Sequence, residues 1–389
     1  MRRFLGYYRQ FEELSPEEVS RAFKERRDEE RAQALTETPP LDLSSPAWHE
    51  PPHAEIVNAA TFALRRAVNA YPDAGAGALA EALAARHGVE PAQVAAGHGA
   101  SELLRSALQA LLAGEEWDSR PPDSRPPEVA MAWPGWGPLP RLVHEAGGRP
   151  VPVPLGRDGA ADVDALAAAA GAATRAVALC SPNDPTGGTI DAAALRRLAA
   201  ALPAGAWILL DAALADFEEP GADLAALTGE LERLLVVRSF SKAHAMAGFR
   251  AGYAVGPDGS RELLGRLAPP LGVAAPAQAG MTWAVANGER YLPRRRALAA
   301  SEREHLAAAL AGTDLAFPPG TGPLLWLSSA GLEGRELAAE LAAKRIFVAP
   351  GSAWGDDRHV RVALRGPGAT DRLAAALKEL GGGPGAPAA

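Results

Sequence analysis

The sequence predicts an α/β protein with a large domain on a mostly parallel, doubly wound sheet and a smaller α+β domain. From Val94 to Val255 short apolar runs alternate with helical segments, a pattern typical of parallel strands joined by covering helices. Beyond Leu267 this alternation stops, which indicates the second domain. We assign residues 1–55 to an N-terminal arm and part of the small domain, 56–285 to the large domain, 286–380 to the small domain and 381–389 to a disordered tail.

The first part of the chain predicts helices around an irregular segment. Ser15 suits a helix N-cap and Pro16 the first helical position, with acidic residues in the first turn. Helices are expected over 15–34, 56–70 and 78–87, and a short edge strand at 41–43 inside the Pro-rich segment 38–52.

The central and C-terminal parts supply the remaining elements. Strands are expected at 128–132, 149–154, 176–180, 207–211, 234–238 and 251–255, with helices at 101–113, 162–170 and 191–201. In the small domain we expect helices at 293–311, 333–344 and 371–380 and strands at 324–327, 345–348 and 359–364. Ligands of doubly wound sheets bind at the carboxyl ends of the strands.

Composition excludes several classes of function. The 389 residues are 48% hydrophobic and 22% charged, with a net charge of −8, which argues against nucleic-acid or anionic-membrane partners. The single Cys180 excludes an intrachain disulfide framework and favours a reducing, cytoplasmic location. No apolar run approaches the roughly 18 residues of a spanning helix. We therefore expect a soluble cytoplasmic protein that binds neither nucleic acid nor membrane.

The segment from Val236 to Gly256 draws attention to Lys242. An apolar strand, a tight loop and a second apolar strand would place this lysine at the mouth of the sheet. Ser239 precedes it by three positions and Arg250 follows by eight, so its neighbours can hold an anion while the amine stays reactive. A lysine in an isolated loop of this kind is more often a simple surface residue. Whether Lys242 has a chemical role therefore depends on the residues at the other strand ends.

Those strand ends carry unusual residues. The glycine-rich turn at 97–102 leads into a helix whose free backbone N–H groups can bind phosphate. Trp136 follows a strand and can stack on a flat ring or fill core, and the turn at 181–188 supplies polar groups. Asp211 ends an apolar strand, where a buried carboxylate is costly unless it meets a cation.

Together these features specify one ligand. It has a phosphate for the helix N-terminus, Ser239 and Arg250, and a flat ring for Trp136. It also has a basic ring nitrogen for Asp211 and an aldehyde for Lys242. That ligand is pyridoxal 5'-phosphate bound as a Schiff base, and we expect no metal.

Three motifs occur in the order of a known family: YPD at 71–73, SPNDPTG at 181–187 and SFSKAHAMAGFRAGY at 239–253. From about Leu41 to Leu380 the chain resembles the fold type I pyridoxal-phosphate enzymes. It is most similar to class I/II aminotransferases of the histidinol-phosphate aminotransferase branch.

The resemblance implies roles for individual residues. Lys242 would be the Schiff-base lysine and proton carrier, Asp211 the partner of the pyridinium nitrogen and Trp136 the stacking residue. Tyr71 would reach the cofactor phosphate of a neighbouring subunit, so the active unit would be a homodimer. The phosphate would be held by Gly99, Ala100, Ser101, Ser239 and Arg250.

Arg361, in HVRVAL, falls where the family has the arginine that binds the substrate α-carboxylate. A guanidinium suits this planar, bidentate contact. The alternative is a surface arginine that forms a salt bridge on a strand.

The chain departs from the family pattern on the phenolate side of the cofactor. Asp184 stands where the family usually has asparagine, and Leu214 where it has tyrosine. Both usual groups donate hydrogen bonds to the phenolate, so their loss predicts an imine that stays protonated to higher pH. Asn183, next to Asp184, could turn inward instead. The segment 41–53 also lacks the Asn-Glu-Asn run of relatives that use histidinol phosphate.

The expected function is therefore an aminotransferase that moves an amino group between an amino acid, or an amino-acid-like amine, and a 2-keto acid. Other reactions on this scaffold stay open: a decarboxylase resembling threonine-phosphate decarboxylases, a β-lyase or an oxygen-using oxidase. A ligand-sensing regulator is disfavoured because the short, acidic N-terminal part leaves no room for a DNA-binding domain.

Overall fold

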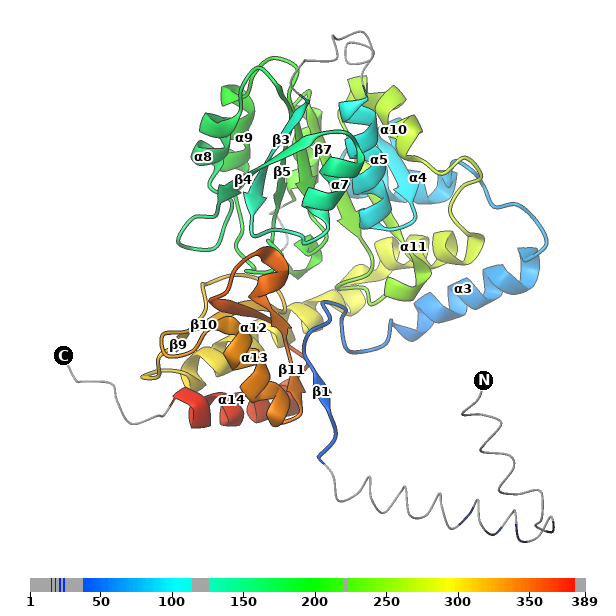
Figure 1. The fold of residues 1–389 in the computed structure, drawn as a ribbon. Coiled ribbons are helices and arrows are strands. Elements are labelled where there is room, and N and C mark those ends of the chain that lie inside the picture. Colours follow the sequence, from blue (N-terminus) through cyan, green and yellow to red (C-terminus); the bar gives the residue numbers. More distant parts are fainter. Residues whose placement is uncertain are drawn as a thin grey trace.

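The computed structural model describes residues 38–113, 126–219 and 223–381, together with Ser15, Glu18, Arg21 and Lys24. The Ser15 hydroxyl oxygen accepts a hydrogen bond from the backbone N–H of Glu18 at 3.4 Å, which fits the expected N-cap. The rest of the helix expected over 15–34, and the expected tail beyond Gly381, lie outside the described residues. Figure 1 shows two sheet-containing parts, with α11 and α12 running between them.

The larger part holds, within the described residues, a seven-stranded sheet of order β2-β8-β7-β6-β5-β3-β4. All its pairs are parallel except those of β8 with β2 and β7, which confirms the predicted mostly parallel sheet. The strands are β2 (Val94–Gly97), β3 (Glu128–Trp133), β4 (Arg149–Pro154), β5 (Thr174–Cys180), β6 (Trp207–Asp211), β7 (Leu234–Ser239) and β8 (Gly252–Val255).

Helices cover both faces of this sheet. One apolar layer joins it to α5, α7 and α10, and the other to α4, α8, α9 and α11. In β7 the side chains alternate between the layers, Val236 facing one and Leu235 and Val237 the other. The helices are α4 (Gly77–His87), α5 (Ala100–Leu112), α7 (Leu139–Glu145), α8 (Val163–Ala169), α9 (Ala192–Ala201), α10 (Arg261–Leu267) and α11 (Ala275–Asn287).

Two predicted helix starts prove to be caps. The carboxylate of Asp162 accepts a hydrogen bond from Ala165 N at 2.9 Å, and that of Asp191 accepts one from Ala194 N at 2.7 Å. Both aspartates therefore satisfy free N–H groups of the first turn from just outside their helices.

The smaller part combines two short sheets with three helices. β1 (Leu41–Asp42) pairs in parallel with β11 (Ile346–Phe347), and a four-stranded sheet has the order β12-β13-β10-β9 in the described chain. The strand expected at 345–348 is divided, because β11 pairs with β1 whereas β12 pairs with β13. The other elements are β9 (Leu315–Ala316), β10 (Leu324–Ser329), β12 (Ala349–Pro350), β13 (His359–Ala363), α12 (Leu292–Ala309), α13 (Gly334–Ala343) and α14 (Pro367–Gly381).

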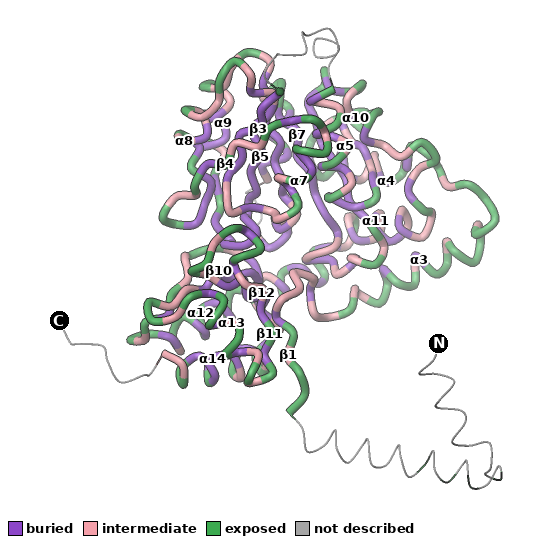
Figure 2. The backbone as a smooth tube through the Cα atoms, viewed as in Figure 1, coloured by how far each residue is buried: buried purple, intermediate pink, exposed green. Residues whose placement is uncertain are grey.

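One helix leaves the body of the large part. α3 (Ala54–Ala67) packs against α11 and extends outward, and most of its length is exposed (Figure 2). Short 3₁₀ segments are also present in the described chain, at Pro91–Gln93, Ala215–Phe217, Leu224–Gly229, Ala247–Phe249, Asp258–Ser260, Gly288–Arg290 and Gly351–Trp354. In the described part of the chain, no helix has the length and apolar character needed to cross a membrane.

Candidate active site

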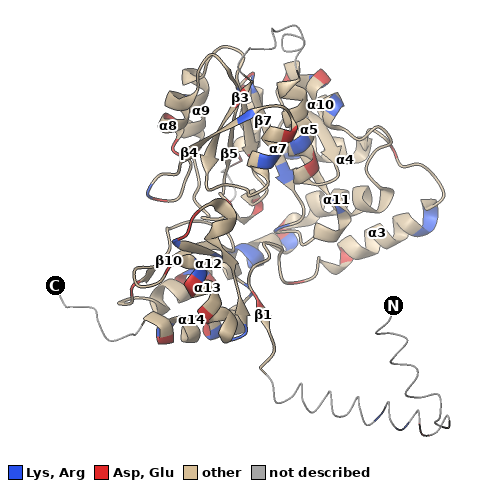
Figure 3. Cartoon of the chain, in the orientation of Figure 1, with Lys and Arg blue, Asp and Glu red and all other residues tan. Residues whose placement is uncertain are grey.

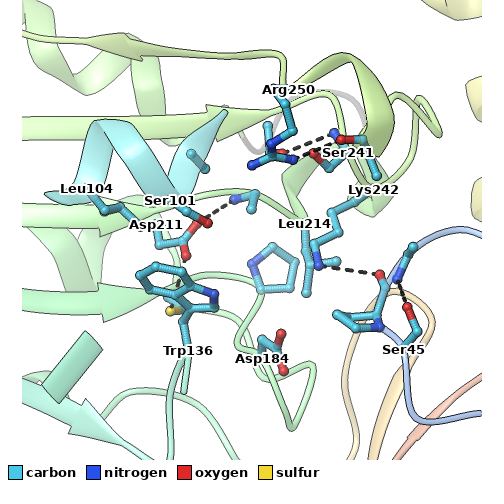
Figure 4. A pocket seen from close by; sticks show the side chains of 18 residues that line it. Ser45, Ser101, Leu104, Trp136, Asp184, Asp211, Leu214, Ser241, Lys242 and Arg250 are labelled. Carbon is cyan, nitrogen blue, oxygen red and sulfur yellow. Dashed lines mark hydrogen bonds between the residues drawn. The ribbon is translucent and has the colours of Figure 1, made fainter. Parts of the chain in front are cut away.

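The carboxyl ends of β5, β6 and β7 open into a cavity of about 230 Å³. The start of α5 forms one wall and the segment Ser45–Ala47 forms another. Figure 4 shows Arg250 and Ser241 toward one end of this cavity and Asp184 toward the other, with Lys242 between them. Predicted site residues in its lining are Ala100, Ser101, Trp136, Asp184, Asp211, Leu214, Ser239, Lys242 and Arg250.

Lys242 enters the cavity from the loop between β7 and β8, as the sequence predicts. Its Nζ donates to the carbonyl oxygen of Pro46 at 3.4 Å. Burial lowers the pKa of the Lys242 amine, while the carboxylates of Asp184 and Asp211 oppose this shift. A lowered pKa increases the fraction of neutral amine at physiological pH, and the neutral amine is the form that attacks a carbonyl.

Asp211 ends β6 and is only 9% exposed. Its described hydrogen-bond donors are neutral: the Ala213 N–H at 2.9 Å and the Cys180 thiol at 3.9 Å. Burial raises the pKa of Asp211 to about 6. A buried carboxylate without a charged donor suits a cationic ligand group.

The N-terminus of α5 lies at one end of the cavity. The N-cap, Gly99, has φ 88° and provides no side-chain cap, so the first N–H groups stay free for a ligand. A Cβ at Gly99 would lie 2.9 Å from Nη2 of Arg250. Glycine is therefore needed both for the left-handed backbone and for the close approach of Arg250.

Arg250 and two serines complete this end. Arg250 itself adopts a left-handed conformation with φ 51°, which is uncommon for a residue with a side chain. Its Nη1 donates to the carbonyl oxygen of Ala247 at 2.9 Å. The Ser239 hydroxyl accepts from the Ser241 N–H at 3.1 Å, and both serines line the cavity. Such a cluster of N–H, hydroxyl and guanidinium donors suits a phosphate.

Asp184 and Arg361 form an ion pair at the opposite end. Nη1 of Arg361 donates to Oδ1 of Asp184 at 3.0 Å, and Nη2 donates to the carbonyl oxygen of Ser44 at 2.7 Å. The Arg361 Cζ atom lies 5.0 Å from the centroid of the Trp354 ring, within cation–π range. Asp184 lines the cavity, whereas Arg361 is outside its lining.

Comparison with known proteins identifies the family. The sequence model of the family "Aminotransferase class I and II" matches residues 41–378. The chain belongs to this family. An aromatic amino acid aminotransferase of Corynebacterium jeikeium is 35% identical over 338 residues, 84% of this chain and 84% of that protein. One of Mycobacteroides abscessus is 33% identical over 301 residues, 77% of this chain and 82% of that protein.

Solved structures agree. The histidinol-phosphate aminotransferase of Sinorhizobium meliloti, solved with pyridoxal-5'-phosphate, superposes with a TM-score of 0.76 at 25% identity, covering 87% of this chain and 90% of that one. The N-succinyldiaminopimelate aminotransferase of Mycobacterium tuberculosis gives a TM-score of 0.75 at 26% identity, covering 88% and 93%. The predicted class I/II, fold type I family is confirmed.

The protein is a pyridoxal-phosphate-dependent aminotransferase, as the sequence predicts. Its cavity fits this cofactor. The buried carboxylate of Asp211 has only neutral donors among the described residues, and the uncapped α5 leaves N–H groups for a phosphate. Within the described chain, no group of three or more His, Cys, Asp or Glu side chains could hold a metal ion.

Trp136 and Leu214 both line the aminotransferase cavity. Trp136, from the turn after β3, lies beside Asp211 (Figure 4). Leu214 follows β6, is 2% exposed and presents its alkyl side chain to the cavity. The position where the family usually has a tyrosine hydroxyl therefore supplies no hydrogen-bond donor here.

Besides Arg361, three candidate residues lie outside the cavity lining of their own chain. Asn183 does not turn inward, because its amide donates to Pro134 O and Thr186 Oγ1, each at 3.0 Å. Gly99 directly precedes Ala100 and is the N-cap residue of α5. Tyr71 lies beyond the end of α3 and is 84% exposed.

Sequence reasoning missed several lining residues. Ser241 could have been found, since it repeats the hydroxyl of Ser239 next to Lys242. Cys180 pairs directly with Asp211 across β5 and β6, a register that strand order alone leaves open. The segment Ser45–Ala47 has no such signal, because its residues are small or apolar and irregular.

A buried network of polar side chains around Asp216 contacts the loop that carries Lys242 through His244. Asp216 accepts from Arg238 at 2.8 Å and from Arg86 at 2.6 Å, and it contacts His244 at 3.1 Å. His244 also contacts the hydroxyl of Tyr291. Burial raises the pKa of Asp216, but Arg238, Arg86 and His244 together hold it well below its usual value. Burial lowers the pKa of His244.

Proposed function

We propose that this aminotransferase transfers the amino group of an amino acid with an aromatic or large apolar side chain to a 2-keto acid. The observation that carries this proposal is that Lys242 and Asp211 face one cavity whose far end is the uncapped N-terminus of α5. The side-chain class is supported by the names of the relatives, aromatic amino acid aminotransferases. Apolar residues of the lining, Leu104 among them, agree with it.

Lys242 is the catalytic residue in this proposal. Its amine would hold the cofactor covalently and would serve as base and acid for the proton of the substrate's amino-bearing carbon. Pyridoxal phosphate supplies an electron-accepting ring when bound. Asp211 would hold the ring nitrogen through its buried carboxylate, and Trp136 would hold the ring from the side of the cavity beside Asp211.

The remaining residues hold the ends of the ligands. The phosphate is bound by Gly99, Ala100, Ser101, Ser239 and Arg250, to which we add Ser241 because it lies beside Ser239. Arg361 binds the α-carboxylate of the substrate, and Asp184 and Leu214 lie on the phenolate side. Asn183 supports the turn through Pro134 and Thr186.

A homodimer is the second part of the proposal. α3 exposes large apolar side chains, including Phe62 at 62% and Leu64 at 47% exposure, and such patches mark protein interfaces. Its charged residues, Glu55, Arg65 and Arg66, lie near its two ends (Figure 3). The exposed Tyr71 then reaches the cofactor phosphate of the partner subunit.

The division into the domains 1–55, 56–285 and 286–380 also stays a proposal, in keeping with the two sheet-containing parts. A cytoplasmic location remains a prediction that rests on the single cysteine.

The proposal is tested on the purified holoenzyme with single amino acids and no keto acid. Transamination converts the cofactor to its amine form and releases one keto acid per site, and phenylalanine, tyrosine and tryptophan should react faster than alanine or aspartate. Carbon dioxide release would instead indicate the decarboxylase, and oxygen consumption the oxidase. A holoenzyme that reacts with none of these amino acids contradicts the proposed substrate class.

A further inference from the structure

Asp184 stands between the cavity and Arg361. Its carboxylate lines the cavity, and its Oδ1 accepts from Arg361 Nη1 at 3.0 Å. Both side chains are 11% exposed. A ligand in the cavity therefore meets the carboxylate before it meets the guanidinium.

The guanidinium is already engaged on two of its nitrogens. Nη1 binds Asp184 and Nη2 binds the carbonyl oxygen of Ser44 at 2.7 Å, whereas the buried Nε has no hydrogen-bond partner among the described residues. A ligand carboxylate is bound best by two parallel N–H groups of one arginine. Nη1 and Nη2 each keep a second N–H group, so a ligand carboxylate bound there shares the guanidinium with Asp184 and Ser44.

The charges around Asp184 are balanced without a ligand. Two cationic side chains, Lys242 and Arg361, and two carboxylates, Asp184 and Asp211, gather here. Asp184 pairs with Arg361 and acts electrostatically on both Lys242 and Asp211. A substrate carboxylate adds a third negative charge beside Asp184. Like charges at this distance repel in a buried site.

We propose that Asp184 competes with the substrate's α-carboxylate for Arg361 and is a specificity-determining residue of this aminotransferase. A substrate α-carboxylate at Arg361 meets the competing negative charge of Asp184 on the same guanidinium, so the site discriminates against carboxylates relative to uncharged groups at the same position. This inference rests on the proposed role of Arg361. An asparagine at 184 keeps the shape of the side chain and removes the competing charge.

The test measures binding without turnover. Isothermal titration of the holoenzyme uses 3-phenylpropanoate, which lacks the amine, and its uncharged counterpart 3-phenylpropanamide. Asp184→Asn should bind the carboxylate about tenfold more tightly or better, and bind the amide as the wild type does. Glu50→Gln is the matched control, since it also removes one carboxylate, from a residue that pairs with Arg294 outside the cavity lining, and it should change neither affinity.

A variant without Arg361 distinguishes competition for this arginine from direct repulsion between Asp184 and the ligand carboxylate. In Arg361→Leu, Asp184→Asn should bring no gain in carboxylate affinity; an equal gain there overturns the proposal, as does an unchanged affinity in the wild-type background. Arg361→Gln, which also lacks the positive charge, replaces the leucine variant if circular dichroism shows that the latter is unfolded. The proposed function fails separately, through absence of amino transfer from aromatic amino acids, which leaves these dissociation constants in place.

Discussion

The Nε2 atom of His244 lies 3.1 Å from Oδ2 of Asp216. This contact joins the loop that carries Lys242 to the segment that follows Asp211. The positions of Lys242 and Asp211 therefore both depend on the buried side chain of Asp216. Asp216 also holds Arg238, whose side chain is 5% exposed.

Asp216→Ala should therefore destabilise the protein strongly. It leaves the buried charge of Arg238 without this partner, and breaking such a pair costs about 3–5 kcal/mol of unfolding free energy. Urea denaturation followed by circular dichroism measures the loss. Glu230→Ala is the control, because it removes an exposed ion pair with Arg196 and should leave the free energy of unfolding nearly unchanged. Equal losses in the two variants would contradict the role given to the network.

Lys242→Ala should abolish covalent attachment of the cofactor. Borohydride reduction of the wild-type holoenzyme fixes the cofactor to its lysine, and peptide mass spectrometry should find the label on Lys242. The variant should show no labelled peptide and lose at least about a thousandfold in the rate of amino transfer. Lys344→Ala, on the small part of the molecule where Lys344 pairs with Glu379, should keep both properties. A label on another lysine would disprove the assignment.

The ionisation of Asp211 should make the cofactor-free protein less stable as pH rises. Burial raises its pKa from 3.8 to about 6, so the folded state binds more protons than the unfolded state between these values. The stability linked to this proton is present below pH 4 and is lost as pH rises to 6. At one pKa unit per 1.36 kcal/mol, the loss is about 3 kcal/mol.

Denaturation of the cofactor-free wild type and Asp211→Asn from pH 4 to pH 8 measures this effect. The wild type should lose stability relative to the variant across that interval. Bound cofactor supplies a cation to the Asp211 carboxylate. Above pH 6 the wild-type holoenzyme should therefore be more stable than the Asp211→Asn holoenzyme. A difference between the two cofactor-free proteins that stays constant with pH would rule out the shift.

Charge placed on α3 should weaken the proposed dimer. Phe62→Asp introduces a carboxylate into the exposed apolar face, and burial of an unpaired charge at the interface should raise the dimer dissociation constant at least about tenfold. Sedimentation velocity across a dilution series measures it. Phe347→Asp is the control, because Phe347 is a comparably apolar residue, 44% exposed, on β11. If Phe62→Asp sediments as the wild type does, α3 is not the interface.

Sequence reasoning located the chemistry where a strand ends in a polar residue. Asp211 ends one apolar strand and Lys242 follows another. Adjacent parallel strands end at the same edge of the sheet, so the pattern places these two residues close together. The family resemblance supplied the cofactor and the reaction, and the comparisons confirm both.

Contacts between distant segments lay beyond that reasoning. The pairing of Asp184 with Arg361 joins β13 to a turn of the large part, and no local pattern encodes it. α11 was also missed, because its sequence APAQAGMTWAVAN lacks the polar face that marks a surface helix. It packs against α3 and the large sheet, so several of its sides are covered.

The segment between β1 and α3 crosses from the small part to the large part over the cavity. Arg361 and Arg365 reach the carbonyl oxygens of Ser44 and Ser45, at 2.7 and 3.5 Å. Both arginines lie on the small part, so these two contacts fix the crossing segment to that part beside the cavity that the segment lines. The shape of this cavity wall therefore depends on how the small part sits against the large one.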